Sequence, residues 1–355
     1  MPGNEITTNN FSKFGKLSKF SDMRTSQADF HCQWQHLKNS HVRALAWMLT
    51  APVLLDRDCG LWQDKIALPL VADKQALQDW VNALDQNPEG LIDLLHQHPS
   101  RRLGLYAETL FEYFLSSHQM LYAHGLQVHN KGKNTVGEFD FLLYADGGLK
   151  HLELATKFYL YHKAARMHQP ESLSGLYDYL GPNLADSLAA KMQKIVSQQL
   201  QLSQHPLAQD LLPQAVVSAQ ALVLGWLFYR DGDQPGVDTH AEGIANDHCQ
   251  GFIWTHSELA VMDFQHGLIL DRLDWLAPAQ VEQGRAHDKA KIISGLHAHF
   301  QIANTPVMLA LMQENQALMQ EYSRGMVVPD SWFADADAVQ AKQLAREEIP
   351  DMSAS

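Results

Sequence analysis

The chain has 355 residues, of which 46% are hydrophobic and 19% are charged, a composition typical of one large or two small globular domains. Its formal net charge of -13 argues against a protein that coats nucleic acid through bulk electrostatics, but it leaves room for a local basic groove. No apolar run is long enough for a transmembrane helix, and three widely spaced cysteines cannot form a disulfide framework. We therefore expect a cytoplasmic protein with no membrane partner.

The first third of the chain has no catalytic motif. Residues 1–29 are rich in Ser, Thr, Asn and Lys, predict a disordered tail and contain no secretory signal. Residues 30–100 have apolar positions at helical spacing and form a helical N-terminal region. Residues 101–118, RRLGLYAETLFEYFLSSH, predict an amphipathic helix in which Glu108 flanks the apolar stripe, while Glu112 lies opposite the stripe and is expected to be solvated.

The middle of the chain, residues 101–235, predicts a compact core of helices and strands. The 101–118 helix is followed by a strand at MLYAHGLQVHN and by a hairpin, GEFDFLLYADGGLKHLELATKFYL, that covers residues 137–160. The Asp-Gly pair in its turn favours a tight connection. A helix is expected over 184–204, with Asn183 as its N-cap, and the apolar QAVVSAQALVLGWLFY reads as a central strand. The predicted order is helix, three strands, helix, strand.

The C-terminal third is expected to elaborate this core or to form a small subdomain, spanning residues 236–333. It contains strands at GFIW and GLILDRLDWL, a helix at PVMLALMQENQALM and an irregular segment at SRGMVVPDSWF. Residues 334–355 form an acidic tail rich in Ala and Gln.

The hairpin holds charged residues in an otherwise apolar setting. Period-two alternation places Asp140, Glu153 and Lys157 on one face of the sheet. Two buried carboxylates repel each other and are costly to desolvate unless a cation neutralises them. With a backbone carbonyl they are hard oxygen ligands suited to Mg²⁺ or Mn²⁺. Lys157 would act on water or phosphate, and Glu108 would complete the metal shell or accept a water, as in metal-assisted phosphodiester hydrolysis.

A simpler interpretation of the same residues stays open. Asp140 and Glu153 would be strand-end charges that pair with Lys157 and a nearby Arg or His. Cross-strand pairs of this kind are common and weak.

The arrangement of Glu108, Asp140 and E-L-A-T-K resembles the PD-(D/E)XK nuclease superfamily over residues 101–230. More closely, LGLYAE, GEFDFLL, LELATKFYL, YLGPN, LVLGWLFY and LDWLAP resemble an uncharacterised bacterial family labelled domain of unknown function 1853, over roughly residues 40–333. Both resemblances imply a restriction-endonuclease-like αβββαβ core, a mixed central sheet flanked by helices. The superfamily resemblance also implies a Mg²⁺-dependent nuclease acting on DNA more readily than on RNA, with metal at Asp140, Glu153 and Glu108 and with Lys157 catalytic.

The chain departs from the superfamily pattern at one position. Ala155 stands where the pattern has lysine, and Lys157 is the one lysine on the same strand face. The departure favours an alternative class of function, a catalytically inactive nuclease fold that binds nucleic acid or protein. A hydrolase for a non-nucleic phosphoester is a third interpretation.

Two further groups of residues bear on ligands. Residues 129–166 contain six Lys or Arg and four Asp or Glu, and we expect phosphate contacts from Lys131, Lys133, Lys191 and Lys194. A second cluster, His240, His248, Cys249 and His256, has residue types that bind zinc, but its irregular spacing is unlike that of zinc sites.

Overall fold

The computed structural model describes residues 26–71, 73–132, 134–163, 174–233 and 241–347. The helices are α1 Ser26–Trp34, α2 Ser40–Thr50, α3 Lys74–Gln86, α4 Glu89–Gln97, α5 Leu103–Ser117, α6 Leu188–Lys194, α7 Pro206–Leu211, α8 His256–Val261, α9 Lys289–Ile302 and α10 Trp332–Glu347. The strands are β1 Leu121–His129, β2 Thr135–Ala145, β3 Gly148–Tyr161, β4 Tyr179–Leu180, β5 Val216–Tyr229, β6 Cys249–Thr255, β7 His266–Ile269, β8 Gln280–Glu282, β9 His287–Asp288, β10 Val307–Asn315 and β11 Leu318–Val328.

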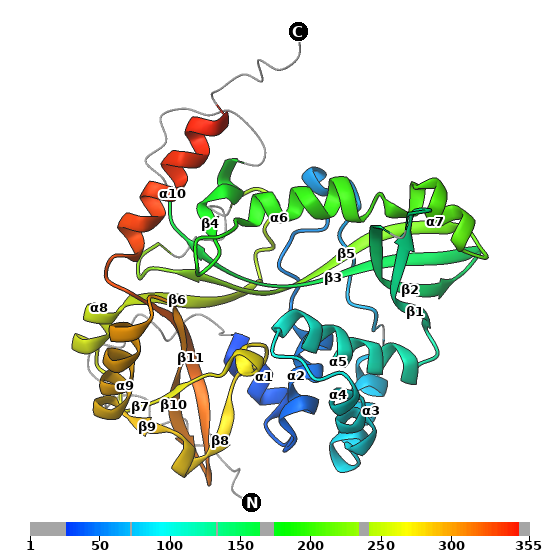
Figure 1. Cartoon of the computed structure of the whole chain (residues 1–355). Helices are drawn as coiled ribbons and strands as arrows, with labels where there is room; N and C mark the ends of the chain where they lie inside the picture. The colour runs from blue at the N-terminus through cyan, green and yellow to red at the C-terminus, as the bar shows by residue number, and fades with distance from the viewer. Residues whose placement is uncertain (1–25, 72, 133, 164–173, 234–240, 348–355) are drawn as a thin grey trace, which may run out of the picture.

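One mixed sheet runs through the molecule, in the order β1-β2-β3-β5-β6-β11-β10-β7-β9. The β3–β5, β5–β6 and β6–β11 pairs are parallel, and the others along this path are antiparallel. The C-terminal strands therefore continue the same sheet. Figure 1 shows α5 and α6 on opposite sides of the long strands β3 and β5. The expected class, α/β with a mixed central sheet flanked by helices, is confirmed.

Strand β5 is central because both of its faces are apolar. Leu222, Leu224 and Trp226 pack in the cluster that contains α5, and Val223 and Leu227 pack in the cluster that contains α6. A strand buried on both faces reads as a continuous apolar run, which is why the sequence identified it. Gly225 is required where β5 passes β3, because a Cβ there would lie 1.7 Å from the Lys157 carbonyl oxygen.

The two helices that frame the candidate site differ in how well the sequence predicted them. Helix α5 matches its prediction, and its apolar stripe is buried. Helix α6 is shorter than the expected 184–204, because Leu184 has φ 57° and Ser187, rather than Asn183, caps the first turn. A π-helical turn, η3 Ile195–Gln199, follows α6 directly.

The helix expected at PVMLALMQENQALM is wrong, since this segment forms β10, a turn and the start of β11. Met308 and Ala310 pack in one cluster, while Leu309 and Leu311 pack in another on the opposite face. A strand buried on both faces cannot be distinguished from a buried helix by periodicity alone. The segment SRGMVVPDSWF, expected to be irregular, forms the end of β11 and the start of α10. The expected acidic tail continues α10 as far as Glu347.

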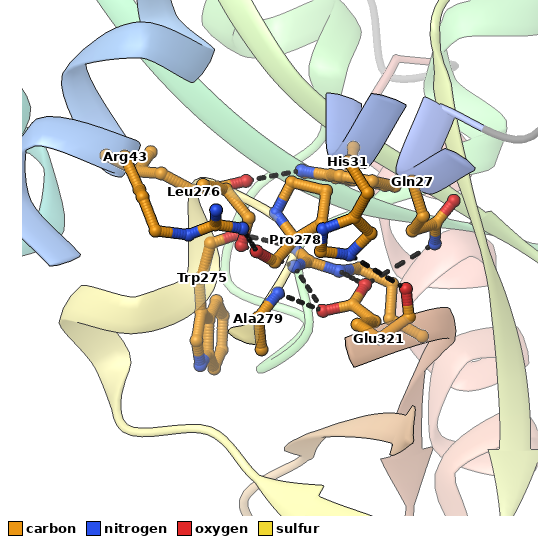
Figure 2. A network of polar contacts seen from close by, with 11 residues as sticks. Gln27, His31, Arg43, Trp275, Leu276, Pro278, Ala279 and Glu321 are labelled. Atoms are coloured by element: carbon orange, nitrogen blue, oxygen red, sulfur yellow. Dashed lines mark hydrogen bonds and ion pairs between the residues drawn. The ribbon is translucent and has the colours of Figure 1, made fainter. Parts of the chain in front are cut away.

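A buried polar network ties the N-terminal helix to the C-terminal half of the sheet (Figure 2). A bulge leaves Tyr322 without a partner residue on β10, and it turns Glu321 and Arg324 to the same side. The two side chains are fully buried and form a two-pronged ion pair, with N–O distances of 2.6 and 2.8 Å. Arg324 also donates to the carbonyl oxygens of Trp275 and Ala277.

Helices α1 and α2 complete this network. The Glu321 carboxylate accepts hydrogen bonds from Gln27 and from the Ala279 amide. The backbone carbonyl oxygen of Glu321 contacts His31 Nε2 at 3.0 Å. Arg43 donates to the carbonyl oxygens of Trp34 and Pro278. Segments far apart in the sequence therefore meet at one buried carboxylate.

The buried imidazole of His31 predicts a loss of stability in acid. Burial, and then the charge of Arg43, lowers its pKa from 6.5 to about 4. The unfolded chain therefore binds a proton below pH 6.5 that the folded protein does not bind until about pH 4, so stability falls as pH falls through this window. Between pH 6.5 and 5, denaturant unfolding should show that the wild type loses about 2 kcal/mol more than His31→Gln, which keeps a donor there. Equal losses would contradict this assignment.

No helix in the described ranges is long and apolar enough to cross a membrane.

Candidate functional site

The candidate site lies where strands β2 and β3 separate. Their ladder runs from the hairpin turn to the Phe141–Leu152 pair and ends there. Beyond it, β2 continues to pair with β1, while β3 next pairs with β4, at Leu160. In the described part of the chain, the edge of β3 between these two ladders has no strand partner. We call this opening the fork.

The two hairpin carboxylates occupy the fork, as the alternation predicted. Asp140 Oδ2 accepts from the Leu154 amide at 3.0 Å, and the Asp140 amide points to Glu153 Oε1 at 3.5 Å. Each carboxylate thus satisfies a backbone group of the strand that carries the other one. The N–H and C=O of a residue in a strand point to the same edge, so the Leu154 carbonyl also faces the fork.

The electrostatics of this pair favour a cation. Burial, then the charges of Glu153 and Glu108, raises the pKa of Asp140 to about 8. At neutral pH, in the absence of a cation, this carboxyl group therefore keeps a proton. A divalent cation would take the place of that proton, because it stabilises both ionised carboxylates at once.

Helix α5 brings Glu108 toward the same pair. The side chain is half-buried, and burial raises its pKa against the opposing charge of His124, with further increases from Glu138 and Glu153. Glu112 is not solvated as predicted, since its carboxylate lies 2.9 Å from His124 Nδ1 of β1. The helical projection could not show this contact, because β1 packs beside α5 on that side.

Lys157 does not join the carboxylates. It lies four residues beyond Glu153 on β3, a Cα separation of about 13 Å along an extended strand. In the described part of the chain it forms no ion pair with Asp140 or Glu153. Burial, then the charges of Lys191 and Arg272, lowers its pKa to about 8, although Asp186 opposes this change.

Two residues that the sequence interpretation missed hold Glu153 in place. His151 Nε2 lies 2.7 Å from Glu153 Oε1, and Gln199 Nε2 donates to Glu153 Oε2 at 2.5 Å. His151 precedes Glu153 by two residues, so strand alternation could have found it. Gln199 reaches the site from the π-helical turn, which has no clear sequence signature.

The candidate phosphate contacts are spread over different surfaces. Lys131 is exposed in the β1–β2 loop, and Lys133 lies outside the described residues. Lys194 is exposed on α6. Lys191, on the same helix, is half-buried, and its Nζ donates to Gln199 Oε1 at 3.3 Å.

The second cluster has core contacts. His248 is buried, its Nε2 contacts the Tyr229 hydroxyl at 2.8 Å and its Nδ1 contacts the Ala245 carbonyl oxygen. Cys249 is buried, His256 begins α8, and His240 lies outside the described residues. The contacts of His248 and the burial of Cys249 are typical of core residues rather than of zinc ligands.

The donors at the fork fit Mg²⁺ or Mn²⁺. The carboxylates of Asp140 and Glu153 and the Leu154 carbonyl offer hard oxygen ligands. Among the described residues, no three His, Cys, Asp or Glu side chains already surround one point as ligands. Mg²⁺ is commonly held by one or two carboxylates and several waters, so Glu108 would contribute through a bound water.

The comparison with family models agrees with the closer of the two resemblances, the one to a domain of unknown function. The model of a family described as a domain of unknown function (DUF1853) matches residues 43–328, more than half of the chain. The chain belongs to this family. Neither a curated protein nor a solved structure matches it.

Proposed function

We propose that this member of the DUF1853 family is a metal-dependent nuclease of the PD-(D/E)XK type, which hydrolyses phosphodiester bonds in nucleic acid, with DNA as the substrate. Asp140 and Glu153 hold Mg²⁺ or Mn²⁺ and Glu108 assists. The metal, when bound, supplies Lewis-acid activation of water and phosphate. The cytoplasm is the proposed location, which suits the free cysteines at positions 32, 59 and 249.

One observation carries this proposal: two carboxylates meet at the fork of β2 and β3. Burial and then the charge of Glu153 raise the pKa of Asp140, and the charge of a third acid, Glu108, adds to this increase. A structural pair of strand-end charges would be neutralised by nearby side chains. His151 contacts Glu153 in this way, but in the described part of the chain no ion pair reaches Asp140, and Lys157 lies elsewhere. Apart from the two-residue strand β4 and the short helix α7, the chain order α5, β1, β2, β3, α6 and β5 also follows the αβββαβ sequence of elements that the resemblance implies.

Cleavage of plasmid and of single-stranded DNA tests the proposal. We expect the full-length protein to cut DNA with Mn²⁺ or Mg²⁺ and to stop when EDTA removes the metal. Glu153→Gln keeps the hydrogen-bonding shape of the side chain but removes its charge, and it should reduce the rate by about 100-fold or more. Asp146→Asn is the matched control, because Asp146 is an exposed acid in the turn of the same hairpin. Metal-independent cleavage, or equal rates for Glu153→Gln and the wild type, would contradict the proposal.

A second function class is favoured by the lysine positions. Ala155 replaces the lysine of the superfamily pattern, and Lys157 stands apart from the carboxylates, so a nuclease fold that binds nucleic acid or protein without cutting is the alternative. DNA retention without cleavage in Mn²⁺ is the outcome that this alternative predicts.

A further inference from the structure

A helix covers the face of the fork on which Glu153 lies. Helix α6 and the π-helical turn η3 pack on β3 and β5, and Leu188, Ala189 and Met192 of α6 share a buried cluster with Ala155. Ala155 is 5% exposed. A lysine in place of Ala155 would lie under helix α6. Its ammonium group would therefore not reach the fork from this position of β3.

The same helix places a different lysine next to the carboxylates. Lys191 Nζ donates to Gln199 Oε1 at 3.3 Å, and Gln199 Nε2 donates to Glu153 Oε2. The π-helical turn directs Gln199 back toward the sheet between these two partners. The ammonium of Lys191 therefore lies one amide group away from Glu153, whereas Lys157 lies four residues along the strand.

Charge effects agree with this position. The ammonium of Lys191 is among the groups that act on Glu108, where it opposes the effect of burial on the pKa. It is also the first charge, after burial, that lowers the pKa of Lys157. Lys191 on α6 is thus close enough to both Glu108 and Lys157 for its charge to act on them.

We propose that Lys191 is the catalytic cation of this site, with Gln199 as the group that positions it, and that its ammonium contacts the substrate phosphate next to the metal. This inference rests on the proposed nuclease function. In the superfamily pattern the catalytic lysine lies on strand β3, at the position of Ala155. In this protein the corresponding positive charge would come from Lys191 on helix α6. Lys157 would then lie outside the reacting centre, where the charge of Asp186 acts on it.

Cleavage and metal binding measured on the same variants test the inference. At saturating Mn²⁺, Lys191→Met should lose about 100-fold or more in cleavage rate. Its Mn²⁺ affinity should change by less than about threefold, because an ammonium group is not a metal ligand. Lys191→Arg keeps the charge with different geometry and should recover part of the rate. Lys291→Met removes an exposed lysine of α9 and is the control for loss of charge.

The outcomes separate this inference from the proposed function. If the wild type cuts DNA and Lys191→Met cuts equally well, or if Lys157→Met is the inactive variant, Lys191 is not the cation while the nuclease function stands. If Lys191→Met also loses Mn²⁺ binding, the residue only maintains the site and the inference is wrong. A wild type that neither binds Mn²⁺ nor cuts DNA overturns both proposals.

Discussion

Replacing Glu321 with glutamine is expected to destabilise the folded protein by about 3–5 kcal/mol. The substitution keeps the volume of the side chain but leaves the Arg324 guanidinium fully buried without its counter-ion. Arg43, whose pKa burial lowers to about 10, is a second buried cation that Glu321 helps to stabilise. Denaturant unfolding followed by fluorescence should therefore show a lower midpoint at unchanged slope.

Two comparisons make this prediction specific. Arg230 and Glu258 form an ion pair in which both side chains are more than 40% exposed, so Arg230→Met should cost less than about 1 kcal/mol. Combining Glu321→Leu with Arg324→Met removes both charges and should cost less than the sum of the two single changes. Additive losses would show that the two side chains do not stabilise each other.

Replacing Asp140 with asparagine is expected to abolish both Mn²⁺ binding and metal-dependent cleavage. Asparagine can still accept from the Leu154 amide, so the fork keeps its backbone contact. It cannot provide the anionic oxygen that a divalent cation requires beside Glu153. At a metal concentration of one hundred times the dissociation constant, the wild type should gain about 2.7 kcal/mol of stability. The variant should gain almost nothing.

The stability of the metal-free protein provides a second readout for this variant. The pKa of Asp140 is raised in the folded state, so the folded protein holds a proton that the unfolded chain releases, and stability falls as pH rises from about 4 to about 8. Asp140→Asn should lack this decrease. Asp146→Asn is the matched control, because Asp146 is exposed in the turn of the same hairpin. A metal-free Asp140→Asn that follows the wild-type pH profile would contradict the assigned environment.

The parts of the fold that could be predicted are those with local signals. Helix α5, the hairpin of β2 and β3 and the central strand β5 follow from apolar periodicity and from an Asp-Gly turn. The C-terminal strands β10 and β11 could not be recognised, because both faces of each are buried. The Glu321–Arg324 pair was also hidden, since its alignment depends on a bulge and its partners come from α1 and α2.

The candidate site was predictable only in part, for a related reason. Strand alternation alone places Asp140 and Glu153 together, and the fork then supplies their backbone contacts. Alternation also places Lys157 on the same face, but sharing a face is not the same as proximity. Alternation also places His151 on the face of Glu153, so its contact with Glu153 could have been predicted. The contact from Gln199 could not, because it depends on a π-helical turn. The position of Lys191 depends on how closely α6 packs over Ala155.

Isothermal titration of Mn²⁺ into the full-length wild type tests the central claim most directly, with Asp140→Asn titrated in parallel. The metal site at the fork predicts saturable binding of Mn²⁺ to the wild type and none to the variant. A wild type that shows no saturable binding would mean that the carboxylates of Asp140 and Glu153 only hold the two strands together, and the nuclease proposal would then be wrong.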